Sequence, residues 1–322
     1  MKAIVFDGRR LNFREDYPIP EPDKAGDALI RVRVAGICNT DLEIIKGYMG
    51  LKGIPGHEFV GTVEKVNERN KSLTGKRVVG EINCVCGVCD YCIGGLPRHC
   101  PQRTTLGISG RDGAFAEYLT LPAENLHEVP DNVSDEEAVF TEPLAAAFEI
   151  VEQVDVKPAD RIIVLGDGKL GLLSAFVLAL TGAETTLAGN HENKLAIARE
   201  AGIGTCLAKG LPVGKKYDVV VEATGTPAGL QKALECVRPR GTIVLKSTVA
   251  STREVDLNRV VVDEITLIGS RCGPFEPALL ALSDKTVNVK PLISGIFPVG
   301  EVLEAFKAAG QKGSLKILID FR

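Results

Sequence analysis

Four cysteines within fifteen residues constrain this chain more than any other feature. They have the spacing C-x2-C-x2-C-x7-C and are Cys86, Cys89, Cys92 and Cys100. Thiolates are soft ligands that hold zinc tetrahedrally, and each C-x-x-C pair can bring two sulfurs to one ion. Four protein sulfurs leave no open coordination position, which is typical of a structural zinc. Disulfides would need an oxidising compartment, and unrelated core cysteines would not cluster, so the spacing predicts a structural zinc lobe.

Length and composition indicate a globular protein of two domains. The 322 residues are too many for one small core, and the hydrophobic share of 45% is ordinary. A net charge of −4 without long basic runs argues against nucleic-acid binding. The longest apolar run, Leu170 to Leu180, is too short to span a bilayer, and we find no secretion signal. We therefore expect a cytoplasmic protein that binds neither membrane nor nucleic acid, with its cysteines reduced or bound to metal.

The first 140 residues are predicted to be mostly β-structure, in a partly closed barrel. Short apolar stretches alternate there with glycine and proline, and a short helix is expected at 40–46. Predicted strands cover residues 3–6, 28–35, 59–66, 76–79 and 115–121.

Three segments of this half could supply ligands to a second metal. Cys38, His57 and Glu142 offer sulfur, nitrogen and oxygen donors, and three ligands with one open position are typical of a catalytic zinc. Each residue also has an ordinary alternative. Cys38 could be a buried thiol, His57 a loop histidine, and Glu142 a carboxylate that stabilises a helix N-terminus.

The motifs follow one another in a characteristic order. Gly-x-Cys-x-Thr-Asp at 36–41 and Gly-His-Glu at 56–58 precede the four cysteines; Gly-Ala-Phe-Ala-Glu-Tyr at 113–118 and Glu-Pro-Leu at 142–144 follow them. This order and spacing resemble the zinc-dependent medium-chain alcohol and polyol dehydrogenases over nearly the whole chain. The resemblance implies a GroES-like β catalytic domain that carries one catalytic and one structural zinc.

The resemblance also implies roles for single residues. Cys38, His57 and Glu142 match the catalytic ligands, and the four clustered cysteines match the structural ones. A glutamate at the third position is similar to the sorbitol, threonine and glucose dehydrogenase branch. Glu58 is expected to orient a ligand or to replace one. Cys84 lies outside the pattern and is left unassigned.

Such a site would oxidise an alcohol. The zinc would lower the pKa of the substrate hydroxyl, and hydride would pass to a nicotinamide. By resemblance Thr40 accepts the alcohol proton, although its hydroxyl could instead cap the helix that begins there. Glu43 stands where the family often has a histidine at the end of the proton relay, and Asp41 is expected to orient the site.

From about Leu144 the pattern changes to strands alternating with helices, which predicts a doubly wound parallel sheet of Rossmann type. Gly166-Asp167-Gly168-Lys169-Leu170-Gly171 follows the apolar strand 161–165 and opens an apolar helix. In this context Gly166, Gly168 and Gly171 predict a dinucleotide-binding turn, with the helix N-terminus facing the pyrophosphate. A glycine-rich turn without a ligand is the alternative. By resemblance Leu170 would pack behind the nicotinamide.

The residues after the next strand bear on the choice of cofactor. An NAD-binding turn should carry an acidic residue about 20 positions beyond the motif, and this chain has Gly189 there. Asn190, His191 and Lys194 could donate to a 2′-phosphate, whereas Glu192 would repel it. We expect NADP rather than NAD. Ordinary solvated loop residues are the alternative.

Taken together, the sequence predicts an α/β protein with a discontinuous GroES-like zinc domain, 1–144 plus 273–322, and a Rossmann domain at 145–272. The expected function is zinc-dependent hydride transfer between a secondary alcohol of polyol, sugar or amino-alcohol type and NAD(P). The partners would be a small alcohol or carbonyl substrate and, by resemblance, other copies in a homodimer or homotetramer. The alternatives are a zinc-free quinone or enone reductase of the same fold, and a catalytically silent NAD(P)-binding sensor.

Overall fold

The computed structural model describes residues 1–22, 26–211, 214–248 and 255–322. It divides into two compact units, and the chain leaves the first and later returns to it. The first unit is Met1–Glu142 with Leu279–Arg322, and the second is Pro143–Ala278. The sequence placed the corresponding boundaries after residues 144 and 272. Among the helices of the described residues we find no candidate for a membrane span.

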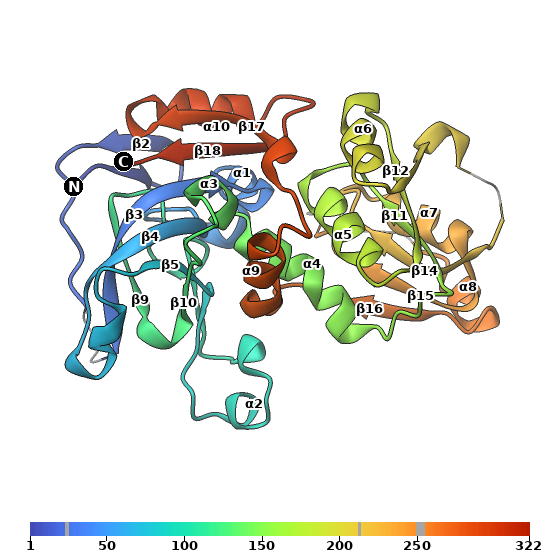
Figure 1. Ribbon diagram of the computed structural model, residues 1–322, viewed down its shortest axis with the longest axis horizontal. Helices are drawn as coiled ribbons and strands as arrows, with labels where there is room; N and C mark the ends of the chain where they lie inside the picture. Colours follow the sequence, from blue (N-terminus) through green and yellow to red (C-terminus); the bar gives the residue numbers. More distant parts are fainter. Residues whose placement is uncertain (23–25, 212–213, 249–254) are drawn as a thin grey trace. The chain divides into compact units, whose positions relative to one another are not determined.

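The first unit is built on a seven-stranded sheet with the order β10-β5-β4-β3-β18-β17, in which β9 also pairs with β3. Its longest strand, β3, pairs antiparallel with the C-terminal strand β18, as Figure 1 shows. The chain end thereby completes a sheet begun near the N-terminus. The strands are β3 (Asp27–Ile37), β4 (Glu58–Lys65), β5 (Arg77–Gly80), β9 (Tyr118–Pro122), β10 (Leu126–Glu128), β17 (Ile293–Pro298) and β18 (Lys316–Asp320).

Smaller elements complete the first unit. A pair of antiparallel strands, β1 and β2, and a three-stranded sheet β6-β7-β8 are separate from the large sheet. As expected, the described helices before Asp135 are short. The strands are β1 (Ala3–Phe6), β2 (Leu11–Arg14), β6 (Asn83–Cys84), β7 (Thr104–Leu106) and β8 (Gly110–Arg111), and the helices are α1 (Asn39–Ile44), α2 (Asp90–Ile93), α3 (Asp135–Ala138) and α10 (Val302–Ala309). Helices α4 (Thr141–Gln153) and α9 (Phe275–Ser283) span the two unit boundaries.

The second unit contains the predicted parallel sheet, with six strands in the order β13-β12-β11-β14-β15-β16. Its central strands are continuous apolar runs such as Ile162–Leu165, because both faces of the sheet are covered. The strands are β11 (Arg161–Leu165), β12 (Glu184–Gly189), β13 (Gly204–Leu207), β14 (Tyr217–Glu222), β15 (Val237–Leu245) and β16 (Thr266–Gly269), and the helices are α5 (Lys169–Ala179), α6 (Glu192–Glu200), α7 (Gly229–Cys236) and α8 (Leu257–Val262).

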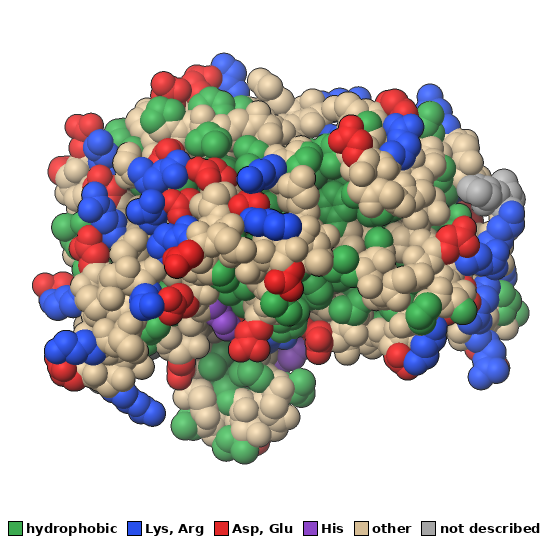
Figure 2. Space-filling view, viewed as in Figure 1, with side chains coloured by type: hydrophobic (Ala, Val, Ile, Leu, Met, Phe, Trp, Pro, Cys, Tyr) green, Lys and Arg blue, Asp and Glu red, His purple; other side chains and the backbone are tan. Residues whose placement is uncertain are grey.

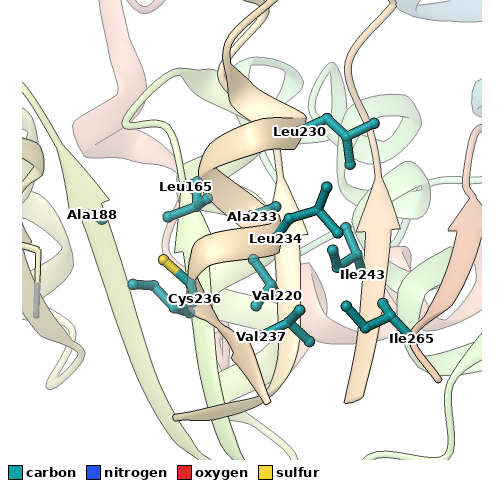
Figure 3. Close-up of a cluster of buried hydrophobic side chains, with 11 residues drawn as sticks. Leu165, Ala188, Val220, Leu230, Ala233, Leu234, Cys236, Val237, Ile243 and Ile265 are labelled. Atoms are coloured by element: carbon teal, nitrogen blue, oxygen red, sulfur yellow. The ribbon is translucent and has the colours of Figure 1, made fainter. Parts of the chain in front are cut away.

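Helix α7 covers one face of this sheet and forms a core with it (Figure 3). Leu230 and Leu234 of the helix lie in the same buried cluster as Val220 of β14 and Ile243 of β15. Burial of side chains of this size contributes about 1.5–3 kcal/mol each. The sheet is therefore a rigid base for the loops at the carboxyl ends of its strands.

Candidate metal centres and dinucleotide-binding loop

The four clustered cysteines converge on one point. The neighbouring sulfur–sulfur distances are 3.5 Å for Cys89–Cys92, 3.6 Å for Cys100–Cys86, 3.8 Å for Cys89–Cys100 and 4.0 Å for Cys86–Cys92. A tetrahedral zinc with bonds of about 2.3 Å has edges of about 3.8 Å, whereas a disulfide needs about 2.05 Å. All four thiols are free. The donor set therefore fits a closed zinc site and does not fit disulfides.

Backbone amides prepare this cluster for a cation. The N–H groups of Val88 and Cys89 lower the pKa of Cys86 to about 6. Burial and hydrogen bonds with the neighbouring sulfurs raise the pKa of Cys92 to about 12. Because zinc binds thiolates, a bound ion would displace the protons of these thiols.

Strand register builds the second centre. Cys38 follows the end of β3, and Gly36 of β3 lies opposite Glu58, the first residue of β4. On the other side of β3, Ile37 lies opposite Ile317 of β18, which brings Lys316 alongside. Ligand atoms of Cys38, His57 and Glu58 all lie within 4.8 Å of one another. Pairing between distant strands thus gathers donors that local sequence does not connect.

Asp41 fixes two members of this group. Its Oδ2 accepts the backbone N–H of Cys38 at 2.8 Å, and its Oδ1 lies 3.2 Å from Nδ1 of the buried His57. Burial lowers the pKa of His57, but Asp41 and Cys38 beside it raise it well above its usual value. The same negative surroundings favour a metal ion. A carboxylate beside one ring nitrogen is the usual arrangement that orients a metal-binding histidine.

Lys316 is the site residue that sequence reasoning missed. Its Nζ forms an ion pair with Glu58 Oε2, and both side chains are almost fully buried. Burial lowers the pKa of Lys316, but Glu58, Cys38 and Glu142 raise it above its usual value. Glu58 Oε1 is buried without a hydrogen-bond partner among the described residues, which suits a ligand to a cation. A lysine in an apolar C-terminal strand gives no sequence signal of this role.

Gly36 makes room for that pair. A Cβ atom at position 36 would lie 2.6 Å from Glu58 Oε2 and 3.3 Å from Lys316 Cδ. The glycine of the Gly-x-Cys motif therefore has a packing reason in the structure.

The remaining predicted residues of this centre lie at different distances from it. Glu142 is the second residue of α4; it acts on the charge of Lys316 but lies outside the three-residue group. Thr40 Oγ1 is 3.8 Å from Cys38 Sγ. Glu43 is exposed and forms an ion pair with Lys46 at 2.8 Å.

The three motif glycines of the second unit differ in their physical roles. Gly166 has a φ of +115°, which favours glycine. A Cβ atom at this position would lie 2.4 Å from the Ala223 carbonyl oxygen. A Cβ at Gly171 would lie 1.8 Å from the Gly166 carbonyl oxygen, so only glycine allows the first turn of α5 to lie this close to the glycine-rich turn. A Cβ at Gly168 would meet no described atom within 4 Å. Packing does not require glycine there, and the open space fits the close approach of a pyrophosphate. Leu170 is the second residue of α5.

The carboxylate of Asp167 contacts the turn after β12, although Asp167 belongs to the glycine-rich turn after β11. Asp167 Oδ2 accepts the backbone N–H groups of Asn190 at 2.6 Å and His191 at 2.7 Å. The His191 Nδ1 also lies 3.0 Å from this oxygen. Lys194 is buried in α6. We expected NADP because glycine at position 189 would remove repulsion toward a 2′-phosphate, but the Asp167 carboxylate lies directly beside Gly189.

Two further buried charges lie at the carboxyl ends of β14 and β15. Glu222 Oε1 accepts bonds from Thr224 N–H, Thr224 Oγ1 and Ser247 Oγ. Lys246 Nζ donates to the carbonyls of Ala146 and Arg271. They fix the loops beside the dinucleotide turn, and only the tertiary structure identifies them.

Comparison with known proteins agrees with this geometry. Residues 24–131 match the family model "Alcohol dehydrogenase GroES-like domain", and residues 170–284 match "Zinc-binding dehydrogenase". A sorbitol dehydrogenase of Halalkalibacterium halodurans is 29% identical, covering 95% of this chain and 94% of the relative. An L-threonine 3-dehydrogenase of Yersinia pestis is 30% identical, covering 94% of this chain and 95% of the relative.

Solved structures extend the likeness to the whole chain. A short chain alcohol dehydrogenase (rspB) of E. coli CFT073, complexed with NADH, superposes with a TM-score of 0.92 at 27% identity, covering 100% of this chain and 99% of that one. A protein of Sinorhizobium meliloti 1021 bound to NADP superposes with a TM-score of 0.89 at 26% identity, covering 99% and 98%.

Proposed function

Because this chain belongs to the zinc-dependent medium-chain alcohol and polyol dehydrogenases, which use NAD(P), we propose that it oxidises a secondary alcohol or reduces the matching ketone. The substrate class that we propose is a polyol, sugar or amino-alcohol. The sorbitol and threonine dehydrogenase relatives support this class. Residues 1–144 and 273–322 would form the catalytic domain, and residues 145–272 the cofactor domain.

The observation that carries the proposal is the convergence of ligand atoms of Cys38, His57 and Glu58, which all lie within 4.8 Å of one another. Cys38 and His57 would hold the catalytic zinc, with Glu58 or Glu142 as the carboxylate ligand. When bound, the zinc supplies Lewis acidity toward the substrate hydroxyl, and the nicotinamide accepts the hydride. Cys86, Cys89, Cys92 and Cys100 would hold the structural zinc.

The residues around the donor set would orient it and move the proton. Asp41 holds the Cys38 backbone and faces the His57 ring, which fixes the positions of both ligands. Thr40, next to Cys38 Sγ, would accept the hydroxyl proton, and the exposed Glu43 would pass it to solvent. Gly166, Gly168, Leu170 and Gly171 would cradle the cofactor, with Gly189, Asn190, His191 and Lys194 at its adenosine end.

Two alternatives make different predictions. A zinc-free reductase of the same fold would have no use for a half-buried cysteine clustered with a buried histidine and glutamate, and would bind one zinc per chain. A silent sensor would bind NAD(P) without turnover. Zinc content distinguishes the first alternative and substrate turnover the second.

The test is Cys38→Ser, with zinc quantified by mass spectrometry and turnover measured on polyols, aldoses and secondary alcohols with both cofactors. We expect two zinc ions per chain in the native protein and one in the variant, with turnover lost and cofactor binding retained. Cys236→Ser is the matched control, because that thiol is buried in the core of the second unit. Native turnover with one zinc, or retained turnover in Cys38→Ser, would contradict the proposal.

We also propose that the protein works in the cytoplasm as a homodimer or homotetramer. Strand β16 is an edge of the parallel sheet, and Leu257, Val261 and Val262 of the neighbouring α8 are exposed. Edge strands and exposed apolar side chains are typical of subunit contacts. Light scattering on the native protein and on Val262→Asp tests this; a monomeric native protein would contradict it.

A further inference from the structure

We propose that Asp167 selects NAD against NADP by placing its carboxylate in the slot for the adenosine ribose. This inference rests on the proposed NAD(P)-binding function and reverses the preference expected from Gly189. It assigns the acidic residue of the slot to the glycine-rich turn after β11, instead of to the end of β12.

Asp167 contacts the backbone at the end of β12. Its side chain, which is 10% exposed, crosses from the turn between Gly166 and Gly168 to the end of β12. There the carboxylate accepts the Asn190 and His191 amides at 2.6 and 2.7 Å and lies beside His191 Nδ1. Three donors hold it at the start of α6, where the ribose of a dinucleotide lies when the pyrophosphate occupies the glycine-rich turn.

The space beside Gly189 is filled by the Asp167 side chain. A Cβ at position 189 would lie 2.4 Å from both Asp167 Cβ and Asp167 Oδ2. The Asp167 side chain therefore occupies the volume that an acidic side chain at 189 would fill. The glycine does not leave the slot neutral; it admits a carboxylate from the neighbouring turn.

One oxygen of the Asp167 carboxylate can accept a further hydrogen bond. Oδ2 accepts both amides, whereas Oδ1 contacts only His191 Nδ1, at 3.1 Å, among the hydrogen bonds of the described residues. A carboxylate oxygen can accept two hydrogen bonds, so Oδ1 retains capacity for a ribose 2′-hydroxyl. A 2′-phosphate cannot donate in this way, and its charge would be repelled by the carboxylate.

Neighbouring charges do not reverse this selection. Lys194 is buried in α6, and the carboxylate of Glu192 adds negative charge near the turn. The guanidinium of Arg199 forms an ion pair with Glu192. The His191 ring has its Nδ1 beside the Asp167 carboxylate.

The experiment measures binding of two cofactor fragments by calorimetry. AMP has a 2′-hydroxyl, and adenosine 2′,5′-bisphosphate has a 2′-phosphate; neither contains nicotinamide, so binding does not depend on zinc or turnover. The zinc-loaded native protein should bind AMP at least about tenfold more tightly than the bisphosphate. Asp167→Asn and Asp167→Ser should shift this ratio toward the bisphosphate by about tenfold or more.

Asp155→Asn is the control, because it removes one exposed carboxylate from the same unit and should leave the ratio unchanged. A native preference for the bisphosphate would overturn the proposal even if both variants failed to fold. If the Asp167 variants bound both fragments more weakly by the same factor, the proposal would also be overturned, because Asp167 would then only stabilise the turn. Fragment selectivity without turnover on any alcohol would instead contradict the proposed dehydrogenase function.

Discussion

At the scale of single residues, the buried Lys316–Glu58 pair has the largest expected energetic effect. Both side chains are at most 1% exposed, and the ammonium also lies 5.7 Å from the Phe140 ring. Removing one partner of a buried ion pair leaves an uncompensated charge, which costs about 3–5 kcal/mol. We therefore predict that Lys316→Met lowers the free energy of unfolding by about this amount, measured by urea denaturation of the zinc-loaded protein.

Lys312→Met is the control for that substitution, because Lys312 is exposed. The double variant Lys316→Met with Glu58→Gln should recover part of the loss, since the amide carries no charge. If Lys316→Met alone were as stable as the control, the pair would have no net role in stability.

At the scale of elements, helix α3 is held by a capping box and an ion pair. Glu137 accepts the Ser134 backbone N–H at 2.9 Å and the Lys285 ammonium at 3.1 Å. Burial raises the pKa of Glu137, but these two donors lower it below its ordinary value of 4.5. A carboxylate with a lowered folded-state pKa stabilises the fold above its unfolded-state pKa, and this stability is lost as pH falls through the folded-state pKa.

We predict that Glu137→Gln, which can keep the capping box but loses the ion pair, costs about 1 kcal/mol at pH 7. The difference from the native protein should shrink as pH falls below about 4.5, because the native carboxylate then becomes protonated. Urea unfolding across this pH range measures both effects. The exposed Glu124→Gln serves as control, and a difference that grew toward low pH would contradict the explanation.

At the scale of the whole molecule, the zinc lobe depends on its metal more than on a core. Val88 and Ile93 are each 76% exposed, and Figure 2 shows such hydrophobic side chains on the surface of the lobe around α2. A segment that buries little apolar surface needs a metal to remain ordered. We predict that Cys92→Ser binds one zinc instead of two and is cleaved by protease within residues 86–100, identified by mass spectrometry.

The second unit should be unaffected by that loss, because it has its own hydrophobic core. Binding of AMP should therefore be retained in Cys92→Ser. Cys206→Ser, outside the lobe, should keep both zinc ions. A Cys92→Ser variant with two zinc ions and a protease-resistant lobe would show that the four sulfurs do not form the site.

The sequence alone determined the features that depend on short spacing. The interval between Cys86 and Cys100 and the Gly166–Gly171 turn are fixed by local chain geometry, so their chemistry is visible in the order of residues. The alternation of strands and helices likewise predicted a parallel sheet, which the structure shows to have six strands.

Only the tertiary structure decided which distant side chains meet. Lys316 and Glu58 are 258 positions apart, and the register of β18 and β4 on β3 brings them together. Asp167 fills the slot at Gly189 because two parallel strands end side by side. Strand pairing and side-chain volume set these contacts, and the residues that meet are too far apart in the chain for their spacing to indicate it.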